Sequence, residues 1–169
     1  GILVAITTIP GVIVHEAAHM LFCKWQSIAI IDVCFFRFGN PVGYVIHEEP
    51  PDFTSSFLVS VGPFIVNSVL CVLICLPAFV PVKVFGLEHP LSYALLWLGI
   101  SIGMHAFPSI QDGRGLWQAA RKAAAHGNIL AIISFPLVLV IYAANVLSFF
   151  WLDYLYGIGI GLGLPALLF

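Results

Sequence analysis

Charged side chains are scarce in this chain of 169 residues, since only 8% of the residues are Asp, Glu, Lys or Arg. Soluble domains carry about 25% charged residues, and the mean hydropathy here is +1.07, so there is too little polar surface to cover a water-soluble globule. Six Lys and Arg against eight Asp and Glu make no basic patch, which excludes a nucleic-acid-binding protein. The composition predicts an integral membrane protein.

Cysteine pairs are also lacking. The four cysteines form no CxxC pair and mostly lie in apolar runs, at Cys23, Cys34, Cys71 and Cys75. This pattern predicts buried thiols rather than disulfides or a thiolate metal site. The length predicts one domain over residues 1–169. No initiator Met and no signal peptide with a cleavage site are visible, and both ends are apolar, so we expect a piece of a longer protein.

Long apolar runs divide the chain into about five expected membrane helices. A bilayer core of about 30 Å requires about 20 apolar residues in a helix. The expected spans are 1–23, 57–80, 91–110, 129–152 and 154–169. The last of these is short for a crossing at about 1.5 Å per residue. We therefore predict an all-α, polytopic membrane protein.

The positive charges orient these spans, because Lys and Arg are enriched in cytoplasmic loops. If the N-terminus faces outside, only Lys83 is external. The other positive residues are then all cytoplasmic: Lys24, Arg37, Arg114, Arg121 and Lys122. This bias favours a multi-pass protein in that orientation.

The segment 27–53, between the first two spans, does not have the pattern of a helix. It is rich in β-branched and aromatic residues, and Gly39-Asn40-Pro41 is a turn signal. We predict a small membrane-associated β-hairpin or sheet, with strands at about 28–37 and 42–47, at the cytoplasmic membrane face. An irregular amphipathic loop is the alternative.

An HExxH motif lies in the first expected span. His15 and His19 are four residues apart and share one helix face, so both imidazoles can bind one zinc ion, with Glu16 beside them to hold a water. The alternative is a buried pair of histidines bonded to the backbone, with Glu16 protonated. Ionisable groups within a membrane helix are costly and usually functional, so we predict a zinc site.

A third protein ligand is needed, because catalytic zinc usually has three and leaves one position for water. Asp112 is the candidate, because it ends the third expected span on the same side as His19. A turn or helix-terminal Asp before Gly113 is the alternative interpretation. His105, about two turns earlier in the chain, is the rival ligand.

A third feature is Gly62-Pro63-Phe64-Ile65-Val66-Asn67 in the second span. A buried amide needs hydrogen-bond partners. The Asn67 side chain either donates to a developing oxyanion in a neighbouring site or makes an interhelical hydrogen bond.

Together these motifs resemble the site-2 protease family of intramembrane zinc metalloproteases. The family has HExxH in one membrane helix, a GPxxxN-like element in the next and an Asp-Gly motif at the end of the following one, in the order seen here. The match covers about 1–115 as a three-helix catalytic core, and accessory helices follow at about 128–169. The membrane-associated strands are also a family feature. The chain departs from the family's Asn-x-x-Pro and Leu-Asp-Gly, having His105-Ala-Phe-Pro108 and Gln111-Asp112-Gly113.

The resemblance implies hydrolysis of peptide bonds in membrane-spanning substrates, as in regulated intramembrane proteolysis. It implies Zn²⁺ held by His15, His19 and Asp112, with Glu16 as general base. Zinc and Asn67 would stabilise the tetrahedral oxyanion, and a strand edge within 28–47 would hold the unwound substrate. The expected partners are a transmembrane substrate and the lipid bilayer, with the active site towards the cytoplasm.

Two other classes remain as alternatives. One is a non-catalytic zinc-binding membrane protein or a transporter, against which the intact Glu16 argues. The other is a different membrane zinc hydrolase that uses a distant Glu ligand, such as the prenyl-protein proteases. The Glu residues outside the motif are all expected in loops: Glu48, Glu49 and Glu88.

Overall fold

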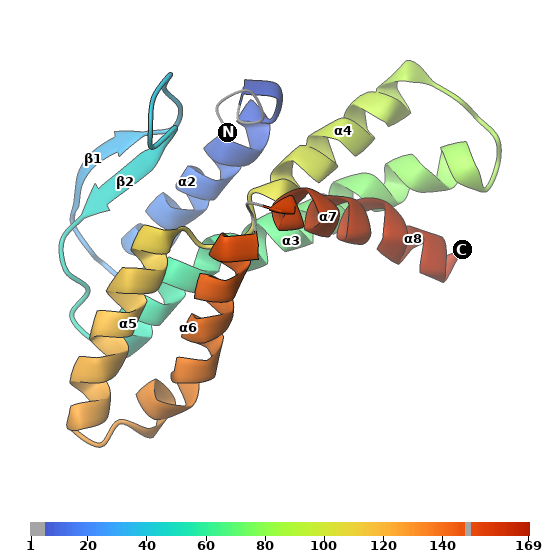
Figure 1. The fold of residues 1–169 in the computed structure, drawn as a ribbon. Coiled ribbons are helices and arrows are strands. Elements are labelled where there is room, and N and C mark those ends of the chain that lie inside the picture. Colours follow the sequence, from blue (N-terminus) through green and yellow to red (C-terminus); the bar gives the residue numbers. More distant parts are fainter. Residues whose placement is uncertain (1–5, 148–149) are drawn as a thin grey trace.

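The computed structural model describes residues 6–147 and 150–169, which are mostly helical with one small antiparallel sheet (Figure 1). The first elements are α2 (Ile9–Trp25), β1 (Ile30–Cys34), β2 (Tyr44–His47) and α3 (Phe53–Lys83). They are followed by α4 (Pro90–Met104), α5 (Ile110–Ala125) and α6 (Ile129–Leu147). The chain ends with α7 (Leu152–Ile158), the π-helical turn η2 (Gly159–Gly163) and α8 (Leu164–Leu168). The expectation of a helical protein with a small sheet after the first helix is confirmed.

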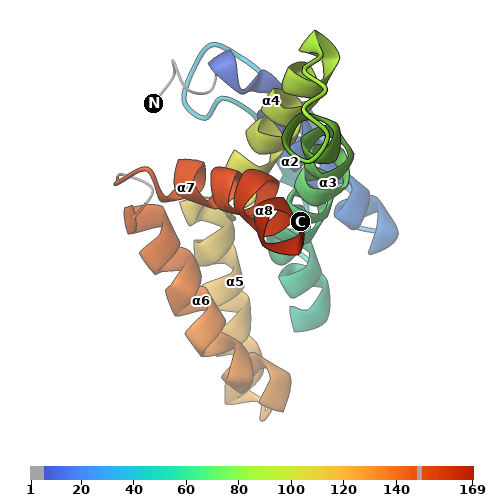
Figure 2. The ribbon, with the colours of Figure 1, turned by 90° about the vertical axis from the view of Figure 1, so that its right-hand side faces the viewer.

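Helix α3 organises the fold, because α2, α4 and α5 all pack against it. Helices α5 and α6 form an adjacent pair near the N-terminal end of α3 (Figure 1). The segment from α7 to α8 packs on α4 and α3 (Figure 2). The turn between α3 and α4 and the turn between α5 and α6 lie at opposite ends of the molecule in both views (Figures 1 and 2).

Helix α2 is held between α3 and α4 at two close approaches. A Cβ atom on Gly11 would overlap the carbonyl oxygen of Ser101, and one on Gly62 would overlap the ring of Phe22. Gly11 N also donates to Ser101 Oγ at 3.2 Å. The glycine of the Gly62–Asn67 motif therefore allows α2 and α3 to approach closely.

Two apolar clusters hold the helices together. One joins the start of α3 to α5 and α6, with Phe53, Leu116, Ala120, Ala131, Val138 and Ile141. The other joins α2 to α3 and the segment before β1, with Phe22, Cys23, Ile28 and Val59. Among the cysteines, Cys23, Cys71 and Cys75 are buried and unpaired as expected, whereas Cys34 is only partly buried.

The predicted hairpin is present, with shorter strands than expected. Strands β1 and β2 are antiparallel, with Val33 opposite Val45, and a bulge interrupts β1 between Ile30 and Asp32. Arg37 N donates to the carbonyl of Val42 at 2.7 Å, which closes the connection between the strands. The irregular-loop alternative is therefore wrong for this segment.

The third expected span, 91–110, is wrong at its C-terminal end. Helix α4 ends at Met104, and α5 begins at Ile110 after a short connection. The break has a local cause, because Ser109 is the N-cap of α5 and forms a capping box with Asp112. Helix α5 itself was not expected. Its buried residues Gly113, Leu116 and Ala120 lie three or four residues apart, which gives it one apolar face.

The other expected spans correspond to helices with shifted ends. The run 57–80 lies within α3, and 129–152 begins with α6, which ends at Leu147. The run 154–169 corresponds to α7, η2 and α8, and 1–23 overlaps α2, although residues 1–5 lie outside the described part. Within the described residues, α3 and α6 are long and apolar enough to cross a membrane.

Candidate metal centre

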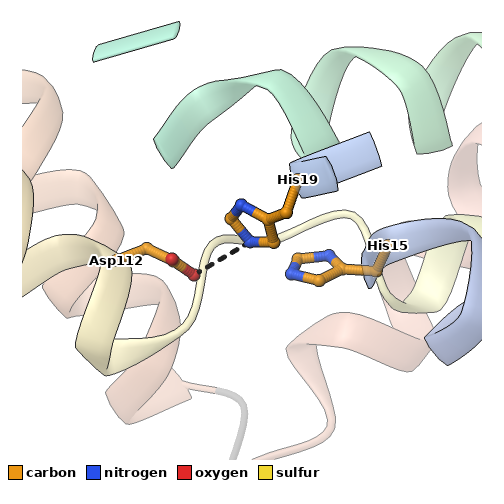
Figure 3. Close-up of side chains that lie close together, drawn as sticks. All are labelled: His15, His19 and Asp112. Atoms are coloured by element: carbon orange, nitrogen blue, oxygen red, sulfur yellow. Dashed lines mark ion pairs between the residues drawn. The ribbon is translucent and has the colours of Figure 1, made fainter. Parts of the chain in front are cut away.

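His15 and His19 lie on successive turns of α2 and present their rings on the same side of the helix. The ring centroids are 4.8 Å apart, and the ring planes are inclined by 75°. The two residues are 9% and 6% exposed, so their ring nitrogens are largely withdrawn from solvent. Figure 3 shows both rings next to the carboxylate of Asp112.

Asp112 completes a group of three potential ligands. Its Oδ2 lies 3.5 Å from His19 Nε2, and the ligand atoms of the three residues all lie within 4.8 Å of one another. Zinc–ligand bonds of about 2.1 Å put tetrahedral ligands about 3.4 Å apart. The His19–Asp112 distance matches this edge. Two imidazoles and a carboxylate are also a donor set that catalytic zinc uses.

The position of Asp112 differs from the expected one. It lies in the first turn of α5 rather than at the end of the preceding helix. Its Oδ2 accepts hydrogen bonds from Ser109 N at 2.8 Å and Ser109 Oγ at 2.6 Å. Asp112 thus both caps helix α5 and faces His19. Its two interpretations, as a metal ligand and as a helix-terminal Asp, are therefore compatible.

A hydrogen bond to the His15 ring decides which of its two nitrogens is free to bind a metal. His15 Nδ1 lies 2.6 Å from the carbonyl oxygen of His105. A carbonyl can only accept, so Nδ1 carries the proton and Nε2 keeps its lone pair for a metal. Such a bond orients a metal-binding imidazole. The His19 ring presents its Nε2 to Asp112.

The rival ligand His105 lies outside this group of three. Its ring Nε2 lies 2.8 Å from Thr8 Oγ1, at the start of α2. Its backbone carbonyl, not its ring, is the atom that contacts His15. Within the described residues, the geometry thus favours Asp112 over His105 as the third ligand.

Glu16 projects from α2 towards the connection that precedes β2. A Cβ atom on Gly43 would lie 2.8 Å from Glu16 Cγ and 3.0 Å from the carbonyl oxygen of Phe35. Only glycine therefore fits between the Glu16 side chain and the backbone of this connection. Nothing in the local sequence around Gly43 separates it from an ordinary turn glycine.

Asn67 is fully buried, and its amide nitrogen bonds to the backbone at the C-terminal end of α4. Asn67 Nδ2 donates to the carbonyl oxygens of Ile102 at 3.1 Å and His105 at 3.0 Å. These are interhelical bonds between α3 and the C-terminal end of α4, as the alternative interpretation expects. The role of Asn67 as an oxyanion donor stays a prediction, and both of its amide hydrogens already have acceptors here.

The group opens into a cavity of about 400 Å³. Its walls come from α2, the connection before β2, and the segment that joins α4 to α5. The lining residues outside the metal group include Glu16, Gly43, Tyr44, His105, Asn145 and Asp153. A hydrogen bond from Tyr44 to Asp32 raises the pKa of the Tyr44 phenol, which keeps this wall residue neutral.

A second cavity of about 950 Å³ adjoins the first and extends along α5. The two share Val45, His47, Gln111 and Asp112 in their walls. The candidate site is therefore open towards β2 and α5.

Two further residues of the site were missed in the sequence. Asp153, before the last apolar run, lines the first cavity, and no local motif marks it. Ser109 fixes Asp112, and the pattern Ser-x-x-Asp at 109–112 is a capping-box signature that predicts a helix start at this point.

Comparisons with protein-family models, with curated proteins and with solved structures found no match to this chain.

Proposed function

We propose that this protein is an intramembrane zinc metalloprotease that hydrolyses peptide bonds of membrane-spanning proteins. One observation carries the proposal. The two histidines of the HExxH motif meet Asp112, from a distant helix, at one end of a cavity that Glu16 also lines. A site that holds only a structural metal has no need of Glu16, whose carboxylate is not one of the three ligands.

The residues of the site have different roles in the proposed reaction. His15, His19 and Asp112 would hold the zinc ion through two nitrogens and one oxygen. When bound, zinc supplies Lewis acidity, which makes water acidic near neutral pH and polarises a carbonyl group. Glu16 takes a proton from the attacking water as general base, and then gives it to the leaving amine as general acid. The water oxygen bonds to the peptide carbonyl carbon, and the tetrahedral adduct then re-forms a carbonyl group as the C–N bond breaks and the amine leaves with the proton from Glu16.

Strand β2 supports the binding of an extended substrate. It pairs with β1 along one edge, and its residues Tyr44, Val45 and His47 line the first cavity. An unwound substrate segment can add to the other edge of β2, which pairs with no strand in the described part of the chain, and this edge supplies backbone hydrogen bonds to the peptide. The scissile bond then lies between this edge and the metal group.

The exposed apolar surface supports a membrane location. Helix α6 exposes Ile129, Leu130, Ile132, Ile133, Leu139 and Val140, among other residues. We infer a multi-pass protein in which α2, α4 and the segment from α7 to α8 also lie within the bilayer. Lys83 lies in the last turn of α3 and Lys122 in the last turn of α5. The turns that follow these two helices lie at opposite ends of the molecule (Figure 1), which agrees with a cytoplasmic α5–α6 turn.

The decisive experiment combines metal analysis with cleavage of a membrane-spanning test peptide. A protease holds about one zinc per chain and cleaves the peptide, and chelation abolishes cleavage that added zinc restores. A zinc-loaded protein that cleaves neither this peptide nor a set of peptides with varied sequences would favour the non-catalytic zinc-binding alternative. A protein that retains no zinc would overturn the proposal.

A further inference from the structure

The C-terminal end of α4 presents backbone carbonyl groups to α2 and α3. The last carbonyls of a helix have no partner within the helix and must find one elsewhere. The carbonyl of Ile102 accepts from His105 N, and that of Gly103 accepts from Ala106 N, as the helix ends in tight turns. The carbonyl of His105 instead points at two side chains from other helices, Asn67 and His15.

The orientation of the Asn67 amide is fixed by its acceptors. Nδ2 has two hydrogens, and two carbonyl oxygens lie at hydrogen-bonding distance from it. The reverse orientation would bring Oδ1 against both carbonyl oxygens, and neither can donate. Asn67 Oδ1 is buried and has no hydrogen-bond partner among the described residues. A fully buried amide with an unpartnered oxygen is costly, so packing alone does not account for an asparagine at this position.

Asn67 is connected to the metal group through one shared atom, the carbonyl oxygen of His105. The oxygen of His105 accepts from Asn67 Nδ2 at 3.0 Å and from His15 Nδ1 at 2.6 Å. Asn67 thereby holds in place the acceptor that fixes the His15 ring. One further contact holds the same residue, since the His105 ring Nε2 lies 2.8 Å from Thr8 Oγ1.

We propose that Asn67 is a positioning residue, which acts through the carbonyl of His105 to keep His15 protonated on Nδ1 with Nε2 directed at the metal. It does not touch substrate or metal. This inference extends the proposed zinc site to a further residue. The part that concerns zinc affinity rests on the proposed function. The tautomer of His15 is a property of the chain without metal and can be measured separately.

The test compares two neighbouring residues of α3. Asn67→Val removes both donors with a moderate change in shape. The matched control is Ser68→Ala, which removes a bond of 2.7 Å to Tyr156 on α7, away from the metal group. The histidine ring nitrogens are observed by NMR in isotope-labelled, metal-free protein, and the His15 signals are assigned with His15→Gln. Zinc affinity is then measured by titration of the same samples.

We expect wild-type His15 to be protonated on Nδ1, and the Asn67→Val protein to show a mixture of tautomers. Zinc affinity should fall by about 10- to 100-fold, the usual effect of losing a bond that orients a ligand. Ser68→Ala should keep both the tautomer and the affinity of wild type. A merely structural role for Asn67 would lower stability without changing the His15 spectrum.

Other outcomes decide against the inference or against the proposed function. The inference is overturned if Asn67→Val keeps wild-type tautomer and affinity, or if Ser68→Ala changes them equally. If Asn67→Val does not fold, Asn67→Ala takes its place and is judged by the same tautomer and zinc measurements. Protonation of wild-type His15 on Nε2 contradicts the proposed role of the His105 carbonyl outright. If wild-type protein binds no zinc, the proposed function fails, whereas the tautomer measurements still decide the role of Asn67.

Discussion

Asp112, in the first turn of α5, faces His19, on α2, with 3.5 Å between the carboxylate oxygen and the ring nitrogen. These residues come from helices that are far apart in the sequence, so the complete ligand set exists only in the folded chain. A metal that binds only this state stabilises it by mass action. Metal binding and the packing of α5 near α2 are therefore linked.

Loss of either imidazole should empty the site. We expect about one zinc per chain in the purified protein, and almost none in His15→Ala or His19→Ala, because two ligands from one chain hold zinc poorly. Elemental analysis after dialysis measures the content. If both variants keep full zinc, the metal lies elsewhere in the chain.

Substitution of Glu16 should separate metal binding from turnover. Glu16→Gln keeps the size of the side chain and its capacity for hydrogen bonds, but it cannot take a proton. We expect zinc content near that of wild type and cleavage lower by at least about 10²-fold, the lower end for a positioned acid–base group. Cleavage of the test peptide at the wild-type rate by this variant would rule out the mechanism.

The choice of third ligand is tested by a pair of variants. Asp112→Ala should lose zinc affinity and activity together, because it removes a ligand oxygen. His105→Ala should leave zinc content largely intact, because the His105 ring pairs with Thr8 and its contact with His15 is through the backbone. The reverse result, with zinc lost only in His105→Ala, would mean that His105 is the ligand, although the hydrolase interpretation would survive.

Gly43 gives a test of the space around Glu16. Gly43→Ala would place a methyl group 2.8 Å from Glu16 Cγ, so the carboxylate or the connection before β2 must move. Since a displacement of about 1 Å at a catalytic group can cost about 10²-fold in rate, we expect cleavage to fall strongly while zinc content stays unchanged. Rates are compared at saturating peptide.

The matched control is Gly39→Ala in the same connection. A Cβ atom on Gly39 would meet only the Arg37 side chain, at 3.6 Å or more, so this variant should cleave at nearly the wild-type rate. Equal losses in the two variants would show that the connection, and not the contact with Glu16, limits the reaction.

The orientation in a membrane can be measured by labelling single introduced cysteines in a background without the native ones. Positions within 84–89 should react only from one side, and positions within 121–128 only from the other, because the two turns lie at opposite ends of the molecule (Figure 1). Labelling of both regions from the same side would contradict the proposed topology.

Local sequence determined much of this molecule. The apolar runs predicted α3 and α6, and the turn signal Gly39-Asn40-Pro41 predicted the hairpin, because hydrophobicity and turn chemistry act over a few residues. The spacing of His15 and His19 placed both rings on one helix face, since a helix turns once in about 3.6 residues. The capping pattern at Ser109 was also present, and it marks the helix start that the hydropathy profile concealed.

Only the tertiary structure decided which distant atoms meet. Spacing could not decide between Asp112 and His105 as the third ligand, because they are only seven residues apart and each can reach the level of His19. The close approaches of Gly11 to α4 and Gly62 to α2 set the positions of the three helices, and these positions turn the His105 ring to Thr8 and its carbonyl to His15. Such contacts depend on how side chains interlock across helices, and this interlocking has no signature within a single segment of sequence.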